Sequence, residues 1–236
     1  NVKDPKYNDI IENNPDSLFL CVDKYIIENW ERALREGSPE LEKSKIPTDA
    51  EINAVVKDCE FQKTIKNDVN RTRVRESVLI ANFREALESL ITLYCKAKNV
   101  FYKQGLNEIA GPFIILKYHL QISFTKIYYM FVCFIDKFLT NYFQEFDFYS
   151  LKSSLSLINL LLRYHDPELF NRFEYSLITP DLYGTSWLLT LFSNKCSLNV
   201  VYHLCDKLIL FDDILFPQFF ITAFLIKNKQ KFCRGI

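Results

Sequence analysis

The chain has 236 residues, and its 29 Lys and Arg balance 29 Asp and Glu, so the formal net charge is zero. This balance gives no general electrostatic reason to expect nucleic acid or an anionic membrane as a partner. Only five residues are glycine, and none lies in a glycine-rich run, which argues against a nucleotide-binding loop within the chain itself.

The first part of the chain shows helix-start signals and one amphipathic stretch. Residues 16–35 are predicted to form an amphipathic helix, and Ser38-Pro39 has the pattern of a cap followed by proline in the first turn. Residues 43–47 are predicted to form a loop. The Thr48-x-x-Glu51 pattern is a capping box, which predicts that another helix begins there.

Residues 78–98 carry the clearest helical pattern. Their apolar side chains recur every three or four residues, as on the core-facing side of a helix: Leu79, Phe83, Leu87, Leu90 and Tyr94. The same reasoning predicts further helices over residues 108–120, 124–142, 151–164, 186–193, 199–210 and 215–229.

Two more short helices are predicted to begin where a capping side chain precedes proline, at Asp166-Pro167 and at Thr179-Pro180. Two-residue alternation, which would indicate strands, and a fixed-period repeat are both absent from the sequence. The sequence therefore predicts an all-α fold with roughly ten or more helices.

The seven cysteines are scattered, with no Cys-x-x-Cys pair and no histidine at ligand spacing from a cysteine pair. We therefore expect free cysteines in a reducing cytosol, without bound metal or a disulfide framework. The most apolar run, residues 127–135, is too short to span a bilayer, and no signal peptide precedes it. Since the chain does not begin with Met, we expect it to be part of a larger protein with further domains.

Residues 65–72, the first motif segment, contain an Asp-x-x-Arg pattern. On a helix, Asp68 and Arg71 lie three residues apart and can touch, so the carboxylate could hold Arg71 or Arg75 in one rotamer. Arg73 and Arg84 add to the positive charge of this region. Taken alone, such a pattern more often belongs to a solvated, salt-bridged helix face.

Residues 101–108, the second motif segment, place Gln104 at the break between two helical patterns. A loop there would present the amide outward, and Gly105 would allow another molecule to approach the backbone closely. The alternative is an ordinary turn between helices in which glycine ends the first one. Three nearby lysines either steer an acidic partner or form a solvated helix end: Lys96, Lys98 and Lys103.

Together, the two segments resemble the signature motifs of the TBC domain, a Rab-GTPase-activating family. The motifs I-x-x-D-x-x-R and Y-x-Q-G are matched by Ile65, Asp68 and Arg71, and by Tyr102, Gln104 and Gly105. Downstream, residues 163–169 resemble the mid-domain P-x-L segment, and residues 183–193, with Trp187, resemble a third recurring block. Asp206 stands where the family has a Trp-Asp pair, with Cys205 in place of the tryptophan.

The resemblance covers residue 17 to the end and is closest to the branch joined to a kinase-like domain. Trp30 and its neighbours represent the usual Arg and Trp of the first helix, which leaves the start of the domain open. The family resemblance implies two packed helical lobes. We expect the N-terminal extension or domain start in residues 1–47, one lobe in 48–150 with both motif segments, and a second lobe in 151–236.

The resemblance also implies a function in vesicle trafficking. Arg71 would enter the active site of a Rab-family small GTPase, and Gln104 would position the attacking water. Asp68, Ile65 and Gly105 would be supporting residues, and Tyr102 would form a wall of the groove. GTP and Mg²⁺ would belong to the partner, so the domain itself would need no cofactor, metal or nucleic acid. It would be cytoplasmic and reach vesicle or organelle membranes through the partner.

Two other interpretations stay open at this point. The chain could be a TBC-like module that binds a Rab or a trafficking complex without catalysis. It could also be an unrelated helical scaffold, in which Arg71 and Gln104 would lie far apart or be buried. A GTPase-activating domain instead requires both side chains to be exposed on one groove. The three isolated histidines are expected to serve a core or surface role: His119, His165 and His203.

Overall fold

The computed structural model describes residues 22–36, 46–73, 80–139, 142–143 and 147–233. Among these residues the secondary structure is helical, with no strand, so the predicted all-α fold is confirmed. In chain order the helices are α2 (Lys24–Glu36), α3 (Asp49–Asn53), α4 (Gln62–Arg71), α6 (Phe83–Lys98), α7 (Leu106–His119), α8 (Phe124–Phe138), α10 (Tyr149–His165), α11 (Pro167–Tyr175), α12 (Pro180–Thr190), α13 (Leu198–Phe211), α14 (Phe216–Lys227) and α15 (Lys229–Cys233).

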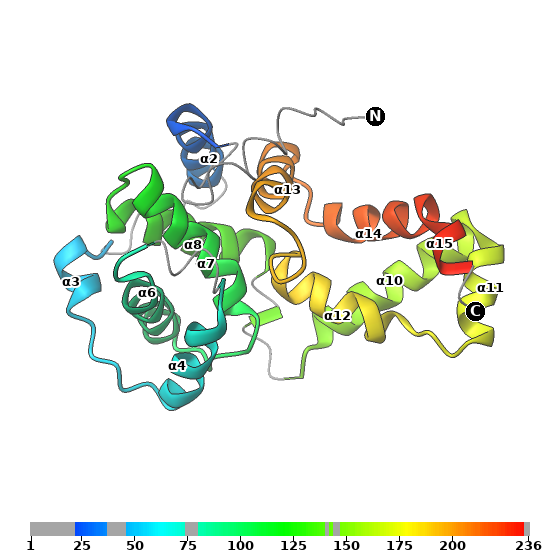
Figure 1. The fold of residues 1–236 in the computed structure, drawn as a ribbon, viewed down its shortest axis with the longest axis horizontal. Coiled ribbons are helices and arrows are strands. Elements are labelled where there is room, and N and C mark those ends of the chain that lie inside the picture. The colour runs from blue at the N-terminus through cyan, green and yellow to red at the C-terminus, as the bar shows by residue number, and fades with distance from the viewer. Residues whose placement is uncertain (1–21, 37–45, 74–79, 140–141, 144–146, 234–236) are drawn as a thin grey trace, which may run out of the picture.

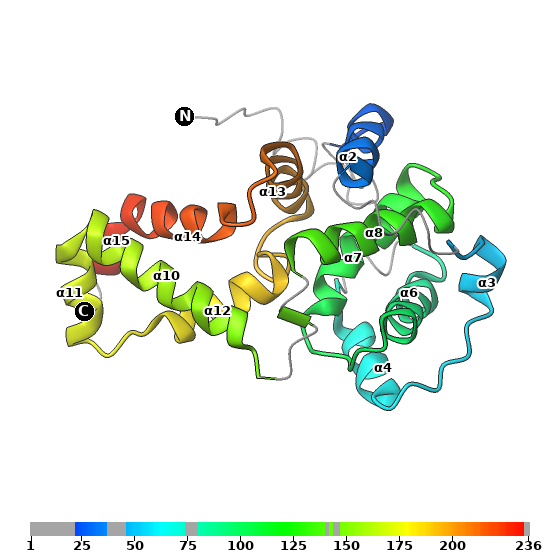
Figure 2. The same ribbon diagram turned by 180° about the vertical axis from the view of Figure 1, so that it is seen from behind.

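The helices form two groups along the long axis of the molecule (Figure 1). One group contains α3, α4, α6, α7 and α8, and α6 packs against both α4 and α7. In the other group, α10 packs against α11, α12 and α14, as the reverse view also shows (Figure 2). Helix α13, which lies in the predicted second lobe, packs on α2 and α7. The division at residue 150 stays a prediction.

Aromatic side chains fill the core of the first group. Phe113 of α7 contacts Phe131 and Phe134 of α8, with ring centroids 5.6 Å apart in both pairs. Phe131 also meets Tyr94 of α6 edge to face at 5.5 Å. Burial of one such side chain contributes about 1.5–3 kcal/mol, so this cluster rigidly joins the helices that carry the motif segments.

The apolar stripe predicted for residues 78–98 faces this core. Phe83, Leu87, Leu90 and Tyr94 are all buried, and Leu79 lies outside the described residues. Helix α6 begins at Phe83 and not at residue 78, because Asn82 has a left-handed backbone with φ of 60°. The residues from 80 to 82 therefore belong to the preceding turn.

Several predicted helix ends match the structure. Thr48 and Glu51 form the expected capping box at α3. Asp166 accepts a hydrogen bond from the Leu169 backbone N–H at 3.0 Å and so caps α11. Thr179 precedes α12 as expected, although its side chain forms no capping hydrogen bond.

Other predicted bounds were wrong. Residues 186–193 do not form a separate helix: they begin inside α12, which ends at Thr190 where Leu191 and Phe192 adopt left-handed φ angles of 43° and 64°. Helix α8 ends at Phe138 and does not reach residue 142. Helix α2 begins at Lys24, and the expected features at residues 16–21 and 38–45 lie outside the described residues.

Within the described part of the chain, no helix is long and apolar enough to cross a membrane. The same residues contain no group of three or more His, Cys, Asp or Glu that could hold a metal ion. Their cysteines are free thiols, and burial raises the pKa of Cys95 and of Cys205 to about 12. These two thiols therefore stay protonated and behave as small apolar side chains.

Candidate functional site

Arg71 is the last residue of α4, and Asp68 lies one turn before it on the same helix. The Arg71 Nη2 atom lies 2.5 Å from the Asp68 Oδ1 atom, and the two side chains are 60% and 3% exposed. The contact predicted from the sequence is thus formed. Because the Asp68 carboxylate is buried and the Arg71 side chain is not, Asp68 holds one terminal nitrogen of a guanidinium that is still open to solvent.

Tyr102 holds Asp68 from the other side. Its hydroxyl donates to Asp68 Oδ2 at 2.7 Å, and the ring is buried. Burial, together with this hydrogen bond, raises the pKa of Tyr102 above its ordinary value, so the hydroxyl remains a donor. We expected Tyr102 to form a wall of the groove described below. Its buried side chain is instead not among the residues that line this groove.

Ile65 fixes the inner face of α4. It is fully buried, as is Val69 one turn later. Helix α4 packs against α6 and α7 through this face. The supporting role expected for Ile65 corresponds here to a core contact that sets where the C-terminal end of α4, and hence Arg71, lies.

Gln104 lies in the connection between α6 and α7, directly before Gly105, and its side chain is exposed. Gly105 has a φ of +110°, and a Cβ atom there would lie 3.2 Å from the backbone oxygen of Leu189 in α12. The close approach expected at Gly105 is thus made by the chain's own α12. Gly105 is the N-cap of α7, whereas the C-cap of α6 is Asn99, which has a left-handed backbone.

Arg71 and Gln104 line one open groove with a volume of about 400 Å³. Helices α4, α7 and α12 contribute to it, together with the loop before α7. The lining residues are Arg71, Lys103, Gln104, Gly105, Asn107, Glu108, Phe148, Ser186, Leu189, Thr190 and Asn194. The two side chains therefore meet the geometric requirement set out from the sequence, and their catalytic roles stay a prediction.

Charges of both signs line this groove. Arg71 and Lys103 are the cationic members, and the Lys103 ammonium lies 4.2 Å from the centre of the Phe148 ring. Burial raises the pKa of Glu108, although the nearby Arg73 and Arg71 charges act in the opposite direction. The groove thus places a partly desolvated carboxyl group near the exposed side chain of Arg71.

The other basic and ionisable candidates lie elsewhere. Lys96 and Lys98 form ion pairs with Asp58 and Asp136 and do not line the groove. Of the three lysines expected near the site, Lys103 is the one that reaches it. The three histidines are exposed and outside the groove: His119, His165 and His203.

Arg73 connects α4 to the segment after α12. Its guanidinium donates to the backbone oxygen of Cys196 at 3.0 Å and to that of Ser193. The backbone of Arg73 is left-handed, with φ of 44°, which turns the chain immediately after the first motif segment. The sequence showed this residue only as part of a basic stretch and not as a link between distant segments.

Asn107 is a further site residue that sequence reasoning missed. It is 2% exposed and contacts Thr72 of the first motif segment as well as Tyr102 and Gly105 of the second. A polar side chain at the buried start of a largely apolar helix is the one signal that could have pointed to it.

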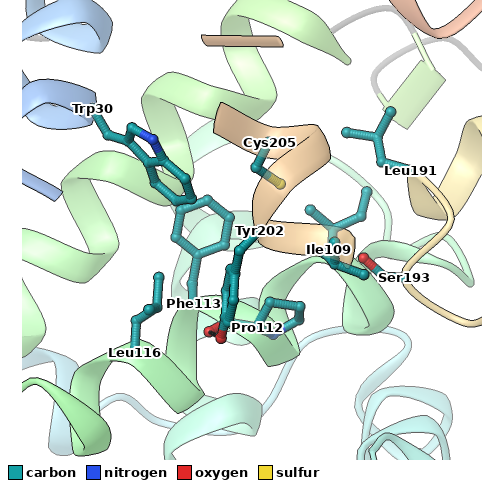
Figure 3. Close-up of a pocket in the computed structure, with 10 residues that line it drawn as sticks. Trp30, Ile109, Pro112, Phe113, Leu116, Leu191, Ser193, Tyr202 and Cys205 are labelled. Atoms are coloured by element: carbon teal, nitrogen blue, oxygen red, sulfur yellow. Dashed lines mark hydrogen bonds between the residues drawn. The ribbon is translucent and has the colours of Figure 1, made fainter. Parts of the chain in front are cut away.

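A second, internal cavity lies between α2, α7 and α13 and has room for about one water molecule. Figure 3 shows Trp30, Phe113 and Tyr202 around Cys205. The Trp30 indole donates to Asp206 Oδ1 at 2.9 Å and so joins α2 to α13. The mostly apolar lining is that of a core gap and not of a reactive site.

Comparisons with known proteins show the family and the fold of the chain. A family model described as the Rab-GTPase-TBC domain matches residues 21–233. The TBC domain-containing protein kinase-like protein of Homo sapiens is 27% identical over 166 residues, which cover 70% of this chain and 17% of that protein. The GTPase-activating protein GYP5 of Saccharomyces cerevisiae is 25% identical over 237 residues, which cover 95% of this chain and 24% of that protein.

The solved structure of the Ypt/Rab-GAP domain of Gyp1p superposes with a TM-score of 0.62 at 16% identity, covering 87% of this chain and 69% of that one. At this identity the likeness shows a shared fold. The chain spans about one sixth of the length of the kinase-like relatives, since it covers 17% of them. The family match extends over nearly the whole chain, and the chain therefore belongs to the Rab-GTPase-TBC domain family.

Proposed function

We propose that this domain accelerates GTP hydrolysis on a Rab-family small GTPase, with Arg71 and Gln104 completing the partner's active site. The observation that carries the proposal is that both side chains line one open groove. Family membership supports it, as does the name of the yeast relative, a GTPase-activating protein. Through a Rab partner, the domain would act in vesicle trafficking at the surface of a vesicle or organelle.

Arg71 is suited to neutralise charge on the transferring phosphoryl group. A guanidinium is always charged and presents a planar fork of donors that matches phosphate oxygens. In the structure one Nη atom pairs with Asp68, and the side chain is still 60% exposed. The remaining donors can therefore meet phosphate without any loss of the residue's support. An arginine supplied in this way contributes about 10³–10⁵ in rate.

Gln104 is suited to orient the attacking water. Its amide can accept a hydrogen bond from the water and donate one to phosphate at the same time. The side chain is exposed, and the rigid start of α7 directly follows it. GTP and Mg²⁺ would be held by the partner, which explains how a chain without a glycine-rich run can act on a nucleotide.

The test is single-turnover GTP hydrolysis by a panel of Rab proteins with the wild-type domain and its variants. At least one Rab should be accelerated. Arg71→Ala should remove about 10³-fold or more of that acceleration, and Gln104→Ala nearly as much. Because the two side chains act as a unit, the double variant should lose no more than the worse single one.

Arg84→Ala is the matched control, since Arg84 is an exposed arginine of α6 that does not line the groove. With this variant, the Rab should hydrolyse GTP at the rate seen with the wild-type domain. Full activity of Arg71→Ala would contradict the assignment of Arg71. If no Rab on the panel hydrolysed GTP faster with the wild-type domain, but one of them bound it, the domain would be a non-catalytic Rab-binding module.

A further inference from the structure

Asn107 belongs to the second motif segment and links it to the first. It is the second residue of α7 and is 2% exposed. Its Oδ1 atom accepts from the Gly105 backbone N–H at 3.1 Å and lies 3.0 Å from the Tyr102 hydroxyl. Its Nδ2 atom donates to Thr72 Oγ1 at 2.8 Å. The oxygen of this amide thus contacts residues of the second motif segment, and its nitrogen donates a hydrogen bond to the first.

These contacts belong to a closed ring of buried polar groups. Thr72, which is fully buried, accepts from Asn107 and donates to the Asp68 backbone oxygen at 2.7 Å. The Asp68 carboxylate in turn accepts the one hydroxyl hydrogen of Tyr102 at 2.7 Å, and the Tyr102 oxygen lies 3.0 Å from Asn107 Oδ1. A closed ring of such groups has few alternative arrangements, because a shift of any member leaves polar atoms without partners.

Both proposed catalytic residues are connected to this ring, Arg71 through its side chain and Gln104 through the backbone of the residue that follows it. Arg71 pairs with Asp68, a member of the ring. Gln104 directly precedes Gly105, whose N–H is held by Asn107. We propose that Asn107 is a positioning residue that sets the orientation of Arg71 and Gln104 relative to each other. The inference rests on the proposed function and adds to it the device that aligns the two side chains.

The amide is the feature that the position requires. Asparagine offers a donor and an acceptor on opposite sides of one short side chain, whereas aspartate of the same shape offers acceptors alone when ionised. Asn107→Asp would place a carboxylate oxygen against Thr72 Oγ1, which already uses its hydrogen on Asp68. The link between the segments would then break while the volume of the side chain stays the same.

The kinetic test measures hydrolysis at increasing domain concentration on an accelerated Rab. Asn107→Asp should lower the maximal rate about 10- to 100-fold, since a small misplacement of reacting groups is enough for such a loss. The domain concentration that gives half the maximal rate should change by less than about threefold, because the docking surface is intact. Thr72→Val should act in the same direction, and its effect should not add to that of Asn107→Asp.

Ile114→Ala controls for general loss of stability. Ile114 is a fully buried residue of the same helix, and its side chain does not line the groove. It should lower the denaturation midpoint and leave the maximal rate of the folded domain unchanged. A drop in maximal rate with Ile114→Ala equal to that of Asn107→Asp, at matched folded fractions, would overturn the positioning role.

A second measurement needs no GTPase. In nuclear magnetic resonance spectra of the free domain, Asn107→Asp should shift both the Gly105 amide signal and the Arg71 Nε–Hε signal. If the Gly105 signal moved and the Arg71 signal stayed, the inference would be wrong whatever the kinetics showed. If both signals moved but the wild-type domain accelerated no Rab, the proposed function would fail and the link through Asn107 would stand.

Discussion

The two motif segments are held in different ways. At the end of α4 the Arg71 side chain is held by an ion pair, at 2.5 Å, with the Asp68 side chain, which is 3% exposed. In the second segment it is the backbone that is held: the Gly105 N–H donates to Asn107, and the Tyr102 ring is buried. The Gln104 side chain is exposed and forms no hydrogen bond to another described residue.

The difference follows from charge. A guanidinium in a groove gains from a fixed counter-charge, and the ion pair restricts a side chain whose free rotamers are worth about 2 kcal/mol. The Gln104 amide is neutral and gains nothing from a fixed counter-charge. Its side chain can therefore remain solvated until a bound partner restricts its rotamers. We therefore expect changes beneath Arg71 to alter hydrolysis on the partner more than changes beneath Gln104.

The largest effect is expected from Asp68→Asn, which removes the counter-charge and keeps the shape. The new amide would direct a donor at Arg71, so the guanidinium would lose its fixed rotamer. We expect the accelerated hydrolysis rate to fall about 100-fold, which corresponds to about 2.8 kcal/mol. Single-turnover hydrolysis on a responsive Rab measures it.

Two companion variants sharpen this prediction. In the Arg71→Ala background, Asp68→Asn should cause no further loss of rate, because its effect acts through Arg71. Asp58→Asn is the matched control: Asp58 is an exposed carboxylate paired with Lys96, away from the groove. Since surface ion pairs are worth little, that variant should be active and stable. A full loss of rate with Asp58→Asn would contradict a role specific to Asp68.

A smaller effect is expected from Gly105→Ala in the second segment. The φ of +110° is unfavourable for alanine, and its Cβ would lie 3.2 Å from the Leu189 backbone oxygen. We expect a loss of about 2 kcal/mol in the free energy of unfolding, measured in urea. Gly111→Ala in α7 is the comparison: a Cβ there would also have a close neighbour, 3.1 Å away, but the backbone is not left-handed, so the two variants differ mainly in the φ angle. Equal losses in both variants would show that position 105 is not special.

The smallest effect concerns Glu108, the last residue of the second motif segment. Burial raises the pKa of Glu108 above its ordinary value of 4.5, so the folded state holds this proton to higher pH than the unfolded state does. The stability that Glu108 contributes is therefore complete below pH 4.5 and declines as the pH rises through the folded-state pKa.

Glu108→Gln removes this titration. We expect the variant to become progressively more stable than the wild type as the pH rises above 4.5, with a constant difference once Glu108 is ionised in both states. Urea unfolding at a series of pH values gives the difference directly. A difference that did not change with pH would show that Glu108 does not titrate differently in the folded state.

Local patterns predicted most of the helices because burial along a helix is periodic. Phe83, Leu87, Leu90 and Tyr94 are buried as their spacing indicates, and the caps at Thr48 and Asp166 form. The errors lie where backbone conformation depends on distant contacts. The left-handed residues that end α12 and precede α6 have no glycine or proline to mark them.

The sequence by itself determined the helical class, the two motif segments, and the Asp68–Arg71 contact, since all of these depend on residues close together in the chain. Tertiary structure alone decided that α12 packs against Gly105, that Arg73 bonds to the carbonyl groups of Ser193 and Cys196, and that Asn107 joins both segments. Such contacts depend on how helices cross, and a crossing is set by the packing of the whole core and not by any local pattern.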